Sequence, residues 1–197
     1  MKNTFLITIT FFIFIFSTAY QTEAEALETK VNDLTNLPTY VDWPKQAFDS
    51  TFADFVFGVV GDEDFAKKLD DIEKGKWLDG HPVSIHHFKT FSTDRVKALK
   101  GCHILFISSS QKENLDVVLQ SLVGKPILIV SDMEHFADQG GMVEFDLRGD
   151  KVNLLINPES ARKAHLHISS RLLQISTIVK SNNKKPKSFP AFLDKNP

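Results

Sequence analysis

The sequence predicts a single three-layer α/β domain: a mostly parallel sheet flanked by helices, with an antiparallel hairpin near the C-terminus. Three observations support this fold class. Short apolar runs alternate with amphipathic stretches through the middle of the chain, which is typical of βαβ crossovers. Phe55–Val60 is apolar throughout, as expected of a strand covered on both faces. Finally, two late strand-like runs are separated only by Arg148–Asp150, which indicates a hairpin at the sheet edge.

The first predicted strand, Phe55–Val60, leads into a helix. Asp62 can cap this helix and Gly75 can end it. A second strand is expected at Val83–Phe88. The apolar side of the helix carries Phe65, Leu69 and Ile72. Before these elements, Leu27–Thr51 has no strong period, and Pro44 favours an extended Trp43.

The strand–helix unit then recurs. Ser92–Leu99 is expected to be a short helix closed by Gly101, and Cys102–Ile107 a third strand. Ser110 and Glu113 have capping-box spacing at the start of a further helix. One stripe of that helix is apolar, formed by Leu115, Val118, Leu119 and Leu122, and the helix is stopped by Gly124 and Pro126.

The last third begins with a fourth strand at Ile127–Val130 and a turn or short helix over Asp132–Gln139. The hairpin strands are Met142–Leu147 and Lys151–Ile156. Asn157 can cap the next helix, with Pro158 at its first position. From Ser169 a final helix is expected, with an apolar stripe of Leu172, Ile175 and Val179.

The N-terminus has the pattern of a secretory signal peptide. Lys2 precedes the apolar run Phe5–Phe16, which is too short for the roughly 20 residues that span a bilayer. Cleavage is expected after Ala26, with Ser17–Ala19 as the alternative site. The predicted organisation is therefore a signal peptide at 1–26, one domain at 27–180 and a polar tail at 181–197.

Charge argues against a nucleic-acid partner. The whole chain has 23 basic and 25 acidic residues. Removing residues 1–26 takes away Lys2, Glu23 and Glu25, which leaves 22 basic and 23 acidic residues and a net charge of −1. A chain so close to neutral has no strong electrostatic reason to bind a polyphosphate.

Cys102 is the only cysteine, so an internal disulfide and a cysteine-rich metal site are both excluded. Because it opens an apolar run, a buried small hydrophobe is the first interpretation. An intermolecular disulfide and a reactive thiol are the alternatives.

The sequence offers no recognisable catalytic motif, cofactor motif or metal site. Gly58–Asp62 follows a strand but lacks the spacing of nucleotide-binding loops. Ser108–Ser110 lacks the G-x-S-x-G elbow of serine hydrolases. His86 and His87 would point to opposite faces of a strand. His165 and His167 have no nearby acidic residue or cysteine to complete a zinc set.

Two arginines are candidate ligand contacts. Arg162 lies in the predicted helix after Asn157, and Arg171 lies in the first turn of the last helix, beside Ser169 and Ser170. A guanidinium can hold a carboxylate or phosphate through two parallel hydrogen bonds, and the start of a helix offers free amides. The competing interpretation is surface charge or a structural ion pair.

The chain resembles the YfiR-like family of periplasmic regulators. The matching segments follow one another in the family's order from about residue 38 to 179: Trp43-Pro44, Phe57–Asp62, Gly80–Val83, Cys102–Ser108, Leu128–Asp132, Phe136-Ala137, Gly140–Met142 and Asn157–Leu173. The resemblance implies an α/β, non-enzymatic protein without a cofactor.

The function implied by this resemblance is regulation. The family's best-known member represses the membrane-bound diguanylate cyclase YfiN by binding its periplasmic region, and so controls cyclic di-GMP and biofilm formation. By resemblance, the partner of this chain is such a cyclase or a histidine kinase, with Trp43 as a partner contact, and a homodimer is a further expectation. Redox control through an internal disulfide cannot carry over, because Cys102 is alone. The alternative function is a periplasmic nucleotide- or amino-acid-binding protein.

Overall fold

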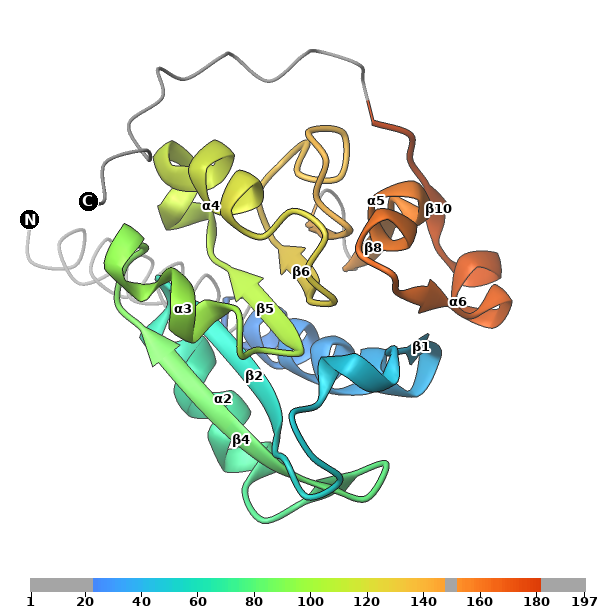
Figure 1. The fold of residues 1–197 in the computed structure, drawn as a ribbon. Coiled ribbons are helices and arrows are strands. Elements are labelled where there is room, and N and C mark those ends of the chain that lie inside the picture. Colours follow the sequence, from blue (N-terminus) through green and yellow to red (C-terminus); the bar gives the residue numbers. More distant parts are fainter. Residues whose placement is uncertain (1–22, 148–151, 182–197) are drawn as a thin grey trace, which may run out of the picture.

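A computed structural model describes residues 23–147 and 152–181 of the chain (Figure 1). Within these residues the main sheet has eight strands, in the order β10-β8-β7-β6-β5-β2-β4-β3. They are β2 (Phe55–Val60), β3 (Trp77–Leu78), β4 (His81–Phe88), β5 (Ile104–Ile107), β6 (Leu128–Ser131), β7 (Val143–Asp146), β8 (Asn153–Ile156) and β10 (Thr177–Ile178). A separate ribbon pairs β1 (Val41–Asp42) with β9 (His167–Ile168).

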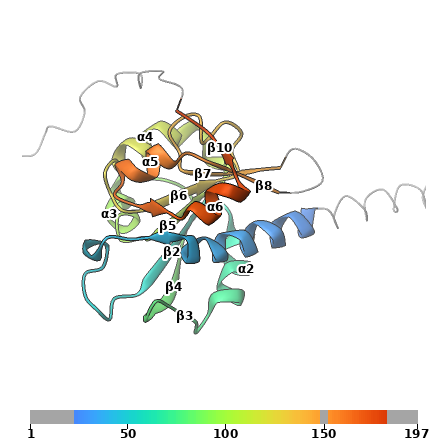
Figure 2. The same ribbon diagram turned by 90° about the vertical axis from the view of Figure 1, so that its right-hand side faces the viewer.

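The helices cover both faces of this sheet. Figures 1 and 2 show α3, α4 and α5 on one face, and α2 with the N-terminal helix on the other. The N-terminal helix covers residues 23–36 of the described chain. The others are α2 (Glu63–Glu73), α3 (Val96–Leu99), α4 (Leu115–Ser121), α5 (Pro158–Lys163) and α6 (Ser170–Ile175), with 3-10 turns η1 (Leu37–Tyr40), η2 (Lys45–Ala47), η3 (Thr93–Arg95) and η4 (Ser109–Asn114).

The predicted fold class is confirmed. The strands β4, β2, β5, β6 and β7 run parallel to one another, and β8 is antiparallel to β7, as the hairpin prediction requires. The turn predicted at Arg148–Asp150 falls among residues 148–151, outside the described part. So do residues 1–22 of the predicted signal peptide and residues 182–197 of the predicted tail.

The core lies between the central strands and α2. All four residues of β5 are fully buried, as a strand covered on both faces should be. The Phe65 ring of α2 stacks on Phe106 of β5, with ring centroids 4.0 Å apart. Asp62 caps α2 as predicted, because its carboxylate accepts a hydrogen bond from the Phe65 amide at 2.9 Å.

The structure differs from the sequence prediction in two places. Leu27–Thr51 has no strong period in the sequence, but its first part, to residue 36, belongs to the N-terminal helix, which buries Val31 and Leu34. The last helix was extended to Val179, but α6 ends at Ile175, which is 75% exposed. The following residues are mostly β-branched, which favours extended backbone, and they form β10 beside β8.

Candidate functional site

The carboxyl ends of β2 and β5 are the part of this sheet where a ligand would be expected in an α/β protein. β4 lies on one side of β2 and β5 on the other, so the strand order reverses between β2 and β5. Ligands of open α/β sheets usually bind at such a switch point. Here Gly61 follows β2, and the turn Ser108–Gln111 follows β5.

Side chains of the protein fill this switch point. The Ser110 hydroxyl donates to the Gly61 carbonyl at 3.1 Å. The Gln111 side-chain oxygen accepts from the Thr90 hydroxyl at 3.0 Å and from the Phe91 amide at 3.1 Å. A Cβ placed on Gly61 would lie 2.6 Å from the Ser110 hydroxyl oxygen. These contacts tie three loops together where a ligand would otherwise sit.

The predicted capping box at Ser110 and Glu113 is wrong. Ser108 is the capping residue, and its hydroxyl accepts from the Ser110 amide at 3.3 Å. The Ser110 hydroxyl is instead turned toward Gly61. The hydrogen bond from Ser110 to Gly61, which is 49 residues away in the chain, takes the place of the local capping bond.

A buried ion pair lies beside the switch point. Lys30 of the N-terminal helix meets Asp132, just after β6, with 2.8 Å between ammonium and carboxylate. Both side chains are about nine-tenths buried. The second carboxylate oxygen of Asp132 accepts from the Ser109 amide at 2.8 Å. The pair therefore fastens the N-terminal helix to the carboxyl ends of β5 and β6.

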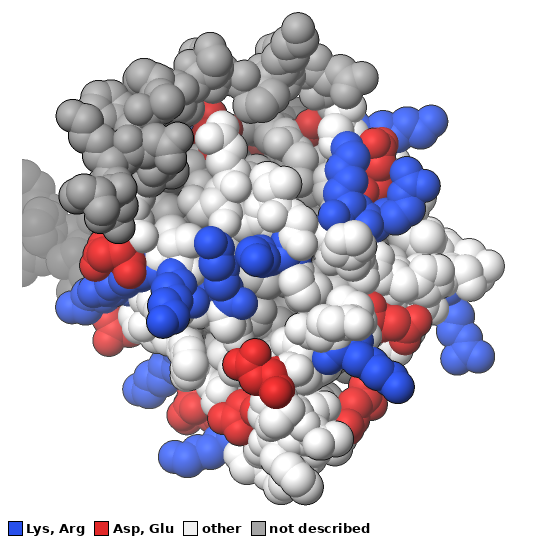
Figure 3. Space-filling view, viewed as in Figure 1, with Lys and Arg blue, Asp and Glu red and all other residues white. Residues whose placement is uncertain are grey.

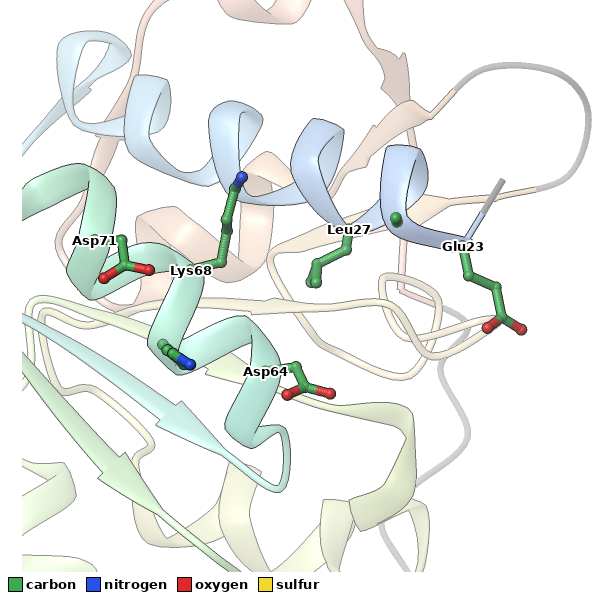
Figure 4. A pocket seen from close by; sticks show the side chains of 7 residues that line it. Glu23, Leu27, Asp64, Lys68 and Asp71 are labelled. Carbon is green, nitrogen blue, oxygen red and sulfur yellow. The ribbon is translucent and has the colours of Figure 1, made fainter. Parts of the chain in front are cut away.

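A pocket opens between the N-terminal helix and α2, with a volume of about 400 Å³ (Figure 4). Its charged lining combines three carboxylates with two lysines, so neither sign of charge dominates. The lining residues are Glu23, Ala24, Leu27, Asp64, Lys67, Lys68 and Asp71. Lys68 is also engaged with Glu28 at 3.6 Å. This lining indicates no particular ligand.

The cysteine and histidines form no metal centre in the residues that the structure describes. His165 has a positive φ of 61° at the end of α5, while His167 is exposed in β9. Cys102 is only 3% exposed, and its sulfur lies 3.8 Å from the Ala98 carbonyl oxygen. The structure thus agrees with the first interpretation of this cysteine, a buried small hydrophobe.

Cys102 is expected to resist thiol reagents while the protein is folded. Burial raises the pKa of its thiol from about 9 to about 12, so roughly one molecule in ten thousand carries a thiolate at pH 8. A colorimetric disulfide reagent should label the native protein very slowly and the urea-unfolded protein at once. Rapid labelling of the native protein, or a disulfide dimer on a non-reducing gel, would contradict the buried position.

The predicted ligand contacts lie on the surface around β9. Arg162 is exposed on α5, and Arg171 is exposed on α6, with β9 between the two helices. Neither arginine forms an ion pair within residues 23–147 and 152–181. Ser169 caps α6 and accepts from the Arg171 amide at 3.2 Å, while Ser170 is exposed. The amide of Arg171 is therefore already bonded, and the ligand role of these residues stays a prediction.

Trp43, the predicted partner contact, is half-buried. Its indole nitrogen donates to the His103 carbonyl at 3.3 Å, and its ring meets Phe55 edge to face at 5.1 Å between centroids. In this position Trp43 holds the loop before β2 against the sheet. A direct contact with a partner also stays a prediction.

Two buried polar side chains between Gly140 and Leu173 serve the fold. The buried Glu144 carboxylate accepts from the amides of His135 and Ala137, at 3.1 and 3.0 Å. The buried Asn157 caps α5 and donates to the Ala137 carbonyl at 2.9 Å. Together they hold the loop after β6. The role of Glu144 was missed in the sequence, where an acidic residue inside an apolar strand was the available signal.

These observations define a one-domain α/β protein whose polar groups at the carboxyl edge of the sheet are engaged in holding its own loops. Comparison with curated proteins found no match. A family model does match, over residues 28–177, and the chain belongs to the YfiR/HmsC-like family. This family is periplasmic and has a regulatory role in cyclic di-GMP signalling. Among the described residues, no helix has the length and apolar character needed to cross a bilayer.

Proposed function

We propose that this chain is a periplasmic, non-enzymatic regulator that binds the periplasmic region of a membrane-bound diguanylate cyclase and represses it. Repression would lower cyclic di-GMP and restrain biofilm formation. The observation that carries the proposal is the family match over residues 28–177. The apolar run Phe5–Phe16 adds support, because it has the length of a signal-peptide core.

The state of the carboxyl edge also favours a protein partner over a small ligand. The switch point between β2 and β5 is occupied by Ser110 and Gln111. A regulator of this kind acts through its surface, and it changes a cyclase only by binding one state of that cyclase more tightly than the other.

Deleting the gene is expected to raise cellular cyclic di-GMP several-fold and to increase biofilm. The physical reason is that the inactive state of the cyclase loses the protein that stabilises it. Cyclic di-GMP would be quantified by mass spectrometry in the wild-type, deletion and complemented strains. A matched strain would express the chain without residues 1–26, which should fail to complement if export is needed.

The partner would be sought by purifying the tagged protein with each membrane diguanylate cyclase of the same organism. Unchanged cyclic di-GMP in the deletion strain, together with no cyclase recovered, would refute the proposal.

A further inference from the structure

Two large aromatic side chains stand exposed at one end of the sheet. Phe52 is 86% exposed in the loop before β2, and Trp77 is 66% exposed on β3. Large apolar side chains that gather on a surface often mark an interaction site. Aromatic residues of this kind are also enriched at the energetic centres of protein interfaces. We call residues 49–54 and 77–80 the aromatic tip.

The two loops of the tip lie side by side. His81, which pairs with Leu78 across the β3–β4 hairpin, donates from its ring to the Ala53 carbonyl at 2.7 Å. Ala53 is the neighbour of Phe52 in the chain. In Figure 1 both loops lie at the lower end of the molecule. Phe52 and Trp77 therefore lie at the same end of the sheet, with Trp77 on the face of the hairpin opposite to the His81 ring.

Each loop is held in a defined shape. Asp79 and Gly80 have φ values of 49° and 85°, as a two-residue type I′ hairpin turn requires. In the other loop, the Ala53 amide donates to the Ser50 carbonyl at 3.2 Å and closes a turn around Phe52. Behind that turn, Phe48 stacks between His81 and His103, with centroid distances of 4.0 and 4.3 Å. A preformed surface loses less conformational entropy on binding.

The charge of the tip indicates the chemistry of its partner. Residues 49–54 and 77–80 contain three acidic residues, Asp49, Asp54 and Asp79, and no lysine or arginine. All three are exposed, and none forms an ion pair within the part of the chain that the structure describes. Figure 3 shows this lower end as mostly uncharged, with both acidic and basic side chains around it. The three aspartates of the tip itself repel anionic lipid and attract a basic surface.

We propose that the aromatic tip docks into an apolar pocket, rimmed by lysine and arginine side chains, on the periplasmic region of the regulated membrane protein. This inference rests on the proposed function and names the surface that carries it out. Phe52 and Trp77 fill the pocket, and the three aspartates steer the encounter. Binding should weaken as salt concentration rises, because exposed charges are screened.

The direct test places a photo-crosslinking amino acid at position 52 of the full-length, exported protein in living cells. Position 123 is the matched control, since Val123 is 76% exposed and apolar but lies between α4 and β6. The expected result is a crosslink from position 52, identified by mass spectrometry as the periplasmic region of a diguanylate cyclase. A crosslink to another membrane protein with a basic-rimmed pocket would support the tip as the docking surface but would refute a cyclase as the partner.

Three crosslinking outcomes would refute the proposal that the tip docks into a partner protein: no product beyond that of position 123, a crosslink to lipid, or a crosslink only to a second copy of this chain. Binding of the purified protein to vesicles of phosphatidylglycerol and phosphatidylethanolamine through the tip would also refute it. Binding to the purified domain that the crosslink identifies would then be measured. The double variant Phe52→Ser, Trp77→Ser should bind this domain at least tenfold more weakly than the native protein, whereas Val123→Ser should bind it equally well. Equal melting temperatures of the three proteins would exclude misfolding as the cause.

Discussion

Asp132→Asn is expected to lower the free energy of unfolding by about 3–5 kcal/mol, the usual cost of leaving one member of a buried ion pair without its counter-charge. Asparagine keeps an oxygen that can accept from the Ser109 amide, which Asp132 does at 2.8 Å in the native protein. The change therefore removes the negative charge with little change in shape. What remains is the Lys30 ammonium, in a residue only 8% exposed.

The surroundings of Lys30 explain why the effect is large. Its nitrogen lies 5.9 Å from the centroid of the Phe65 ring and 6.0 Å from that of Phe106. These aromatic faces offer some attraction to a cation, but far less than the lost carboxylate or bulk water. The N-terminal helix should loosen from the sheet, because this ion pair joins the two.

Urea unfolding followed by far-UV circular dichroism would measure the effect. Lys30→Met combined with Asp132→Asn should recover most of the lost stability, since no unpaired charge remains. Lys68→Met is the matched control: it removes an exposed pair with Glu28, at 3.6 Å, and should cost less than about 1 kcal/mol. Equal losses from Asp132→Asn and Lys68→Met would show that the buried pair has no special role.

The central strands could be predicted from the sequence because their signals are local. Phe55–Val60 is confirmed as β2 without change of boundary, and Asp62 caps α2 as its position predicts. A strand buried on both faces leaves a continuous apolar run, and a capping residue acts within three positions. The same holds for the hairpin of β7 and β8, whose connection is short.

The candidate site could not be predicted in the same way, because its contacts are between distant segments. Lys30 and Asp132 are 102 residues apart, and neither position has a local pattern that points to the other. Pairing across such a distance is a property of the folded chain alone. The arginines are a different case: residue type alone points to Arg162 and Arg171, both are exposed, and their ligand role stays a prediction.

The aromatic tip also has a local signal in the sequence. Asp79-Gly80 is one of the dipeptides typical of a type I′ hairpin, and it follows Trp77-Leu78 directly. The N-terminal helix also had a weak signal, since Leu27, Val31 and Leu34 have the spacing of one helical face. Polar residues fill the remaining positions, so the period was too sparse to decide.

The protein is expected to lose stability as the pH falls from about 6.5 to about 4, and His103 is a main cause. Its Nδ1 accepts from the Val56 amide at 3.0 Å, and its Nε2 donates to the Ala47 carbonyl at 3.1 Å. The neutral ring satisfies both bonds. A second proton would sit on Nδ1, where it would face the Val56 N–H.

The pKa of His103 is lowered from 6.5 to about 4, mainly by burial, with a smaller contribution from nearby His81, while the Ala47 hydrogen bond and Asp49 oppose the shift. Between these two pH values the unfolded chain binds a proton that the folded chain does not. The stabilising contribution is therefore complete above pH 6.5 and is lost as the pH falls toward 4. From the size of the pKa shift, the loss is on the order of 2–3 kcal/mol.

Urea unfolding at pH 7, 5.5 and 4 would compare the native protein with His103→Gln, whose side chain can also accept and donate but does not titrate. All carboxylates are common to the two proteins, so the difference between their pH profiles isolates His103. The native profile should fall more steeply than that of the variant; parallel profiles would assign the acid sensitivity to other groups. Because the His103 ring also stacks on Phe48, which backs the turn around Phe52, its protonation should release the aromatic tip before the rest of the domain unfolds.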